Sequence, residues 1–281
     1  MARINWNLFA RGILFFAVGM AQKVLLADAI AARINPLFAD YTAIQLIGSW
    51  FAMLGYSVQL YFDFAGYSNM AVGLGLMLGF EFPQNFNSPY KAMNISDFWR
   101  RWHMTLSSFL RDYLFIPLGG SRRGTWLTLR NLVIVMFLGG LWHGAGWTFV
   151  IWGLYHGLLL AIHSVASKVS IRIPTSLSVI ITFLCVVFGW VLFRSSDLAM
   201  SANLFSAMFG MYGCETDWLS AVGGGFALAT LGFLLGVVFF LPNVWQWSLR
   251  PSLPMSIVVA TVFVICVLRF DAESPFLYFQ F

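Results

Sequence analysis

The chain has 281 residues, of which 60% are hydrophobic and only 10% are charged, and its mean hydropathy is +0.80. A soluble globular domain carries about 25% charged residues, so this composition excludes an ordinary soluble protein and predicts an integral membrane protein of roughly six to nine helices. The net charge of +5 does not indicate a nucleic-acid-binding protein, because the basic residues cluster at the ends of hydrophobic runs.

The first apolar run spans residues 8–30 and contains four polar or charged residues, namely Arg11, Gln22, Lys23 and Asp28. Such a helix is expected to pack against other helices and not to face lipid. No charged region followed by a short apolar segment and a cleavage site precedes it, so we expect no cleavable signal peptide. The next run, 44–62, reads as a clean span and is followed by Asp63. For this carboxylate we expect a helix N-cap or an ion pair.

The apolar run 70–80 contains Gly73, Gly75 and Gly79, small residues that allow helices to approach closely. Residues 83–94 are rich in Pro, Asn and Ser and are expected to form a loop. Ser96 is a candidate N-cap for the helix that follows, and Pro117 is expected to end it.

That helix is predicted to be amphipathic. Its apolar face carries Trp99, Trp102, His103, Leu106, Leu110 and Tyr113, and its polar face carries Arg100, Arg101, Ser107, Ser108 and Arg111. We expect it to lie at the membrane interface, because the two adjacent arginines must reach water or lipid phosphate.

Two shorter apolar runs, 127–142 and 149–162, are separated by glycines. This pattern favours broken or re-entrant helices around a site, because irregular backbone at membrane depth needs cover from protein or water. Further spans are expected at 177–193, 226–241 and 257–268, a short interfacial helix near 202–208, and an interfacial aromatic tail at 271–281. We see no repeat and no soluble domain, and therefore expect one membrane-embedded unit, residues 1–281.

Seven of the sixteen basic residues fall between Lys91 and Arg130, which predicts that this stretch faces the cytoplasm. One interpretation is that these basic residues set the membrane topology and contact lipid headgroups. The other is a cytoplasmic mouth that attracts a polyanionic substrate such as a nucleotide-bearing coenzyme. On the second interpretation Arg100, Arg101 and Arg111 are the candidate binding residues.

His103 and His143 are the main candidates for catalysis, because an ionisable group in an apolar, tryptophan-rich stretch is expensive and suits acid–base chemistry. Each also has a structural interpretation: His143 as a core histidine bonded across helices, and His103 as an interfacial histidine beside two tryptophans. His156 is interpreted as a helix-packing residue, with lining of the same cavity as His143 as the alternative, and His163 is interpreted as solvated. Neither has acidic partners for a metal site. The isolated Cys185, Cys214 and Cys266 indicate neither a disulfide framework nor a zinc site.

Several segments together resemble one family. They are FWRRWHMTLS at 98–107, RDYLFIPLGG at 111–120 and GLWHGAGW at 140–147, with YFDFAGYS at 61–68 and SPFLYFQF at 274–281. They are similar to the core of the membrane-bound O-acyltransferases, and most of all to the bacterial alginate O-acetyltransferase branch. The similarity covers nearly the whole chain.

The resemblance implies a helical fold with short or re-entrant helices around a central tunnel. It places the catalytic histidine at His143 and the second active-site position at His103. It also implies acetyl-CoA as a cytoplasmic donor substrate with no bound cofactor or metal, and an exported polysaccharide such as alginate or a cell-wall glycan as acceptor, reached through periplasmic acetyltransferase proteins. The location implied is the inner membrane of a bacterium.

Members of this branch are longer, with further N-terminal helices, so the chain is expected to represent the C-terminal part of the family pattern. Two other functions stay open. One is D-alanyl transfer to teichoic acid, which belongs to a related branch. The other is a transporter or scaffold subunit without enzymatic activity.

Overall fold

The structure is a computed structural model of the chain, and it describes residues 5–169, 173–247 and 252–269. The residues that it describes form helices and no strands. Four helical segments are long and apolar enough to cross a membrane, namely Trp6–Ala39, Thr125–His143, Trp147–Ala166 and Thr175–Arg194. The predicted all-α, multi-pass membrane fold is therefore confirmed.

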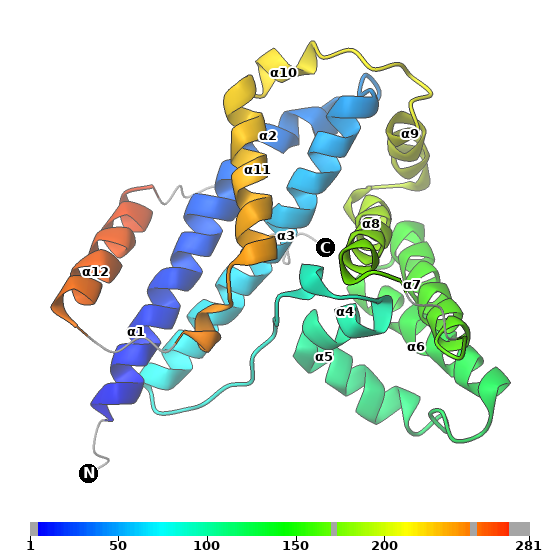
Figure 1. The fold of residues 1–281 in the computed structure, drawn as a ribbon, viewed down its shortest axis with the longest axis horizontal. Helices are drawn as coiled ribbons and strands as arrows, with labels where there is room; N and C mark the ends of the chain where they lie inside the picture. Colours follow the sequence, from blue (N-terminus) through cyan, green and yellow to red (C-terminus); the bar gives the residue numbers. More distant parts are fainter. Residues whose placement is uncertain (1–4, 170–172, 248–251, 270–281) are drawn as a thin grey trace.

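The N-terminal half is a pair of long helices that lie side by side (Figure 1). The first consists of α1 (Trp6–Ala21), the π-helical turn η1 (Gln22–Ala27) and α2 (Asp28–Ala39). The second is α3 (Leu46–Met77), which returns along the first after a short connection. The predicted helix end at residue 62 is wrong, because α3 continues through Asp63. That carboxylate contacts Lys23 Nζ at 2.9 Å, so the expected ion pair is confirmed.

Glycines set the distance between these two helices. A Cβ atom on Gly12 would lie 2.6 Å from the carbonyl oxygen of Gly73, and one on Gly19 would lie 2.6 Å from that of Gly66. The reverse contacts, from Gly73 and Gly66, are nearly as short at 2.7 Å. No side chain fits at either crossing, so the close approach expected at Gly73 is confirmed.

The second half contains a helical hairpin, α6 (Thr125–His143) and α7 (Trp147–Ala166), followed by α8 (Thr175–Arg194) and α9 (Leu198–Met208). After α10 (Trp218–Ala221), α11 (Gly225–Phe240) packs against α2 and α3, and α12 (Leu253–Leu268) lies outside α1 (Figure 1). The span predicted at 177–193 corresponds to α8, whereas the segments predicted at 226–241 and 257–268 form α11 and α12, apolar helices of 16 residues that are shorter than the four candidate spans. The aromatic tail at 271–281 lies outside the described residues.

A loop and several short helices connect the two halves: η2 (Pro89–Lys91), α4 (Ile95–Arg101), α5 (Met104–Phe109) and the π-helical turn η3 (Leu110–Phe115). Tyr90 anchors the loop. Its hydroxyl donates to the Ser57 carbonyl oxygen at 2.7 Å and accepts from Trp190 Nε1 at 3.1 Å. The N-cap of α4 is Asn94, whose side chain accepts from the Asp97 amide, and not Ser96 as expected.

Candidate functional site

The predicted amphipathic helix is interrupted at the first candidate histidine. Trp102 is extended, and His103 adopts the left-handed conformation with φ of +42° before α5 begins. A positive φ is uncommon for a residue with a side chain. His103 therefore does not lie on a helix face, which corrects the sequence-based expectation.

Backbone hydrogen bonds on both sides hold this interruption in place. The Asn87 amide donates to the Arg101 carbonyl oxygen at 2.9 Å, and the Met104 amide donates to the Asn85 carbonyl oxygen, also at 2.9 Å. The indole of Trp102 is buried and packs 4.9 Å from the ring of Trp190. The loop 85–87 thus replaces the helical bonds lost at the break.

The imidazole of His103 has defined neighbours. Its ring meets the ring of Phe64 edge-on, with centroids 4.7 Å apart. Its Nδ1 lies 3.4 Å from the hydroxyl oxygen of Thr105, which in turn bonds Asn85 Oδ1 at 2.7 Å. Burial lowers the pKa of His103 from 6.5 to about 4, so the imidazole is neutral near pH 7.

His143 is the last residue of α6, and glycines shape the turn that follows it. A Cβ on Gly144 would lie 2.6 Å from the ring of Phe149. In the hairpin itself, a Cβ on Gly140 would collide with the Phe149 carbonyl oxygen, and one on Gly153 would collide with that of Met136. The two helices have 19 and 20 residues, longer than the apolar runs from which they were predicted.

Aromatic rings surround the half-buried imidazole of His143. It meets the rings of Trp142, Trp152 and Phe193 edge-to-face at centroid distances of 5.0, 5.1 and 5.2 Å. The ring of Phe193 also lies 5.6 Å from that of Trp190, which packs on Trp102, the residue that precedes His103. The two candidate histidines, 40 residues apart in sequence, therefore lie in one place, each at a helix break.

The other two histidines differ from this pair. His156 is fully buried, and its ring lies 5.1 Å from that of Trp152 and 5.2 Å from that of Trp99. His156 is therefore enclosed by tryptophan rings, consistent with the packing role expected for it. His163 lies near the end of α7 and is only partly buried.

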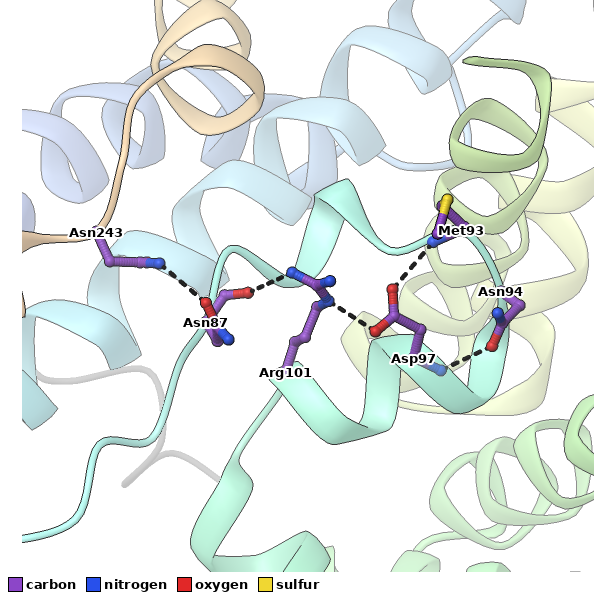
Figure 2. A network of polar contacts seen from close by, with 6 residues as sticks. All are labelled: Asn87, Met93, Asn94, Asp97, Arg101 and Asn243. Carbon is purple, nitrogen blue, oxygen red and sulfur yellow. Dashed lines mark hydrogen bonds and ion pairs between the residues drawn. The ribbon is translucent and has the colours of Figure 1, made fainter. Parts of the chain in front are cut away.

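The three candidate donor-binding arginines have different environments. Arg101 is held within the protein, as Figure 2 shows: its Nε bonds Asp97 at 2.8 Å and its Nη1 bonds the Asn87 carbonyl oxygen at 3.3 Å. Asn243 continues this network through the Asn87 side chain. Arg111 is exposed and pairs with its neighbour Asp112, whereas Arg100 is exposed on α4.

Other features of the described residues lie away from the histidine pair. No group of three or more His, Cys, Asp and Glu side chains among them is arranged to hold a metal ion. A cavity of about 730 Å³ lies between α1 and α12, and its lining includes neither His103 nor His143.

Comparison with known proteins assigns the chain to a family. Residues 2–201 match the model of the MBOAT, membrane-bound O-acyltransferase family. The chain belongs to the membrane-bound O-acyltransferases. The match includes both helix breaks and both candidate histidines, and it ends within α9.

The relatives that this chain resembles are named for three activities. A peptidoglycan O-acetyltransferase from Helicobacter pylori is 45% identical over 77% of this chain and 42% of its own length. A probable alginate O-acetylase AlgI from Pseudomonas putida is 40% identical over 97% of this chain and 61% of its own length. A teichoic acid D-alanyltransferase from Bacillus subtilis is 35% identical over 66% of this chain and 51% of its own length.

The chain thus spans about 40 to 60% of the length of these three relatives. Two residues near His103 were not predicted from the sequence. Thr105 contacts His103, and Asn85 bonds Thr105. Thr105 follows the histidine by two residues within the motif that carries the resemblance. Asn85 was interpreted only as a loop residue, because no pattern in the chain links it to position 105.

Proposed function

We propose that this chain carries the acyl-transfer centre of a membrane O-acyltransferase. It moves an acetyl group from a cytoplasmic donor, acetyl-CoA, toward the hydroxyl groups of an exported polysaccharide such as alginate or a cell-wall glycan. The observation that carries the proposal is the meeting of His103 and His143 at two helix breaks, inside a cluster of aromatic rings. Family membership and the names of the relatives support the reaction class.

In this reaction His143 acts as general base. It takes the proton of an acceptor hydroxyl as the oxygen attacks the thioester carbonyl carbon. The carbon–sulfur bond then breaks, and the proton passes from His143 to the departing thiolate. His103 orients the acceptor or the thioester. The surrounding rings exclude water, which strengthens any hydrogen bond to the developing oxyanion.

The remaining assignments concern the donor, the partners and the membrane. Arg100 and Arg111 are exposed on the basic stretch and attract the phosphates of the donor, while Arg101 mainly holds the loop at Asn87. The positive-inside rule supports a cytoplasmic position for this stretch. The membrane is the inner membrane of a bacterium, and periplasmic acetyltransferase proteins pass the acetyl group to the polysaccharide.

The test measures the acetyl-ester content of the exported polysaccharide in cells that lack their own acetyltransferase. We compare the chain with His143→Ala and with His163→Ala, which also removes one imidazole. General base catalysis contributes roughly 10²–10⁴-fold, so His143→Ala is expected to lose acetylation by at least about 10²-fold while His163→Ala retains it. Near-normal acetylation by His143→Ala would refute the role of this residue.

D-alanyl transfer to teichoic acid is the second candidate, because one relative carries that name. It uses the same histidines on a different donor. Membranes containing the chain are supplied with either acetyl-CoA or a D-alanyl carrier protein, and turnover of each thioester is measured. Turnover of the carrier protein alone would favour D-alanyl transfer. Turnover of neither, in membranes that contain the folded protein, would favour a transporter or scaffold.

A further inference from the structure

The contacts of His103 determine which of its ring nitrogens carries the proton. They begin at Asn85, whose Oδ1 lies 3.3 Å from the backbone nitrogen of Thr105. A backbone N–H can only donate, so this side of the carboxamide must be the oxygen and not the NH₂ group. The other end of the carboxamide, Nδ2, donates to Ser68 Oγ at 3.2 Å. The orientation of Asn85 is thereby fixed.

The hydroxyl of Thr105 has one proton, and Asn85 receives it. The Thr105 Oγ1 lies 2.7 Å from Asn85 Oδ1, and the carbonyl-type oxygen cannot donate. The hydroxyl must therefore donate along this short contact. Its oxygen turns lone pairs toward its other neighbour, His103 Nδ1, at 3.4 Å.

We infer that Thr105 and Asn85 are positioning residues that lock His103 in the tautomer with the proton on Nδ1. The opposite tautomer would set the Nδ1 lone pair against a lone pair of the Thr105 hydroxyl. The ring cannot readily turn away, because Phe64 packs edge-on against it and the backbone at residue 103 is held by bonds to residues 85 and 87.

This tautomer places the lone pair of the neutral imidazole at Nε2. There His103 accepts a hydrogen bond and does not donate one. For its catalytic consequence the inference rests on the proposed acyl transfer: His103 orients the acceptor hydroxyl, or the imidazolium of His143 after proton uptake, through Nε2. The tautomer itself does not depend on any activity.

The first experiment observes the tautomer without turnover. The chain is labelled with ¹⁵N-histidine and studied in nanodiscs, where the protonated and unprotonated nitrogens of an imidazole have well-separated shifts. The chain has four histidines, and the spectrum of His103→Gln assigns the His103 signals. We expect Nδ1–H in the native protein and a shift toward Nε2–H in Thr105→Val, which keeps the shape of the side chain but lacks the hydroxyl.

The second experiment separates positioning from structure. Thr105→Val is expected to lower kcat by roughly five- to tenfold, the effect of one hydrogen bond, with KM for the donor unchanged. Thr105→Ser, which retains the hydroxyl, should restore kcat. Thr182→Val removes a buried hydroxyl that bonds only within α8, and it should leave kcat unchanged.

Two results would overturn the inference even if the chain proved inactive. They are Nε2–H in the native protein, or an unaltered Nδ1–H population in Thr105→Val. An unchanged kcat in an active Thr105→Val protein would overturn the positioning role. An inactive native protein with the expected tautomers would instead refute the proposed function.

Discussion

Lys23 lies inside the first membrane helix between two carboxylates. Its side chain is 5% exposed, and its Nζ lies 2.7 Å from Asp28 Oδ1 and 2.9 Å from Asp63 Oδ1. Asp63 is 2% exposed and lies in α3, whereas Asp28 is 28% exposed and lies where the π-helical turn ends. We predict that Lys23→Met leaves the Asp63 charge buried without its cation and destabilises the protein strongly.

The expected magnitude follows from the separation of the charges. Coulomb's law with an effective dielectric constant near 20 gives about 6 kcal/mol for unit charges 2.9 Å apart. Desolvation offsets part of this, and removal of one partner of a buried pair costs about 3–5 kcal/mol. The double variant Lys23→Met/Asp63→Leu removes both buried charges. It is expected to lie close to the native stability, because apolar replacements of buried pairs are often neutral.

The assay is the free energy of unfolding, measured from tryptophan fluorescence as the chain is titrated from mild to denaturing micelles. Lys168→Met is the control, because Lys168 is exposed and lies outside the helix crossing. A loss for Lys23→Met no larger than that for the control would show that Asp63 is not a buried charge in the native state. A double variant as unstable as the single variant would equally refute the electrostatic argument.

Three further outcomes are expected. Gly153→Ala places a methyl group against a backbone carbonyl of α6, so it should lower the free energy of unfolding by about 1–3 kcal/mol and reduce acyl transfer. Gly232→Ala, with open space around its Cβ position, should be neutral or stabilising, and equal melting temperatures of the two variants would argue against tight packing of the hairpin. Because burial lowers the pKa of His103 to about 4, only the unfolded chain protonates this imidazole between pH 6.5 and 4, and the stability of the protein falls as the pH falls through this window. His103→Gln should lose less stability over the same window, and an identical pH dependence of unfolding in both proteins would contradict the low pKa. Arg101→Gln should lower the melting temperature more than Arg100→Gln, because only Arg101 is held by loop contacts, while Arg100→Gln should raise the KM for acetyl-CoA; the reverse pattern would reassign the two arginines.

The span at residues 177–193 was predictable because a bilayer demands long apolar helices, and this run satisfies that demand without help from the rest of the chain. The continuation of α3 through Asp63 was not predictable. A carboxylate after an apolar run normally indicates the end of a span, and the ion pair with Lys23, 40 residues earlier, helps to make its burial tolerable. The sequence shows both residues but not that the glycine crossings bring their helices together.

The two catalytic candidates show the same contrast between a feature that the local sequence reveals and a feature that depends on distant residues. The break after His143 is visible in the sequence, because Gly144 and Gly146 follow it. The break at His103 has no glycine or proline within it, so the local pattern predicts an uninterrupted helix. Its cause lies outside the segment, in backbone bonds to residues 85 and 87.

Helix breaks give this site a geometry that helix faces would not provide. A side chain inside a helix is directed back along its own face, so two histidines on the faces of packed helices would be held by the packing of whole helices. At a break the backbone direction changes, and the imidazole is aimed by a few local bonds. For His103 these bonds come from residues 85–87 and Thr105, and for His143 the turn is shaped by glycines that admit the ring of Phe149. Substitutions at these positions should therefore reduce acyl transfer at a smaller cost in stability than substitutions at the glycine crossings of α1 and α3, where backbone meets backbone along entire helices.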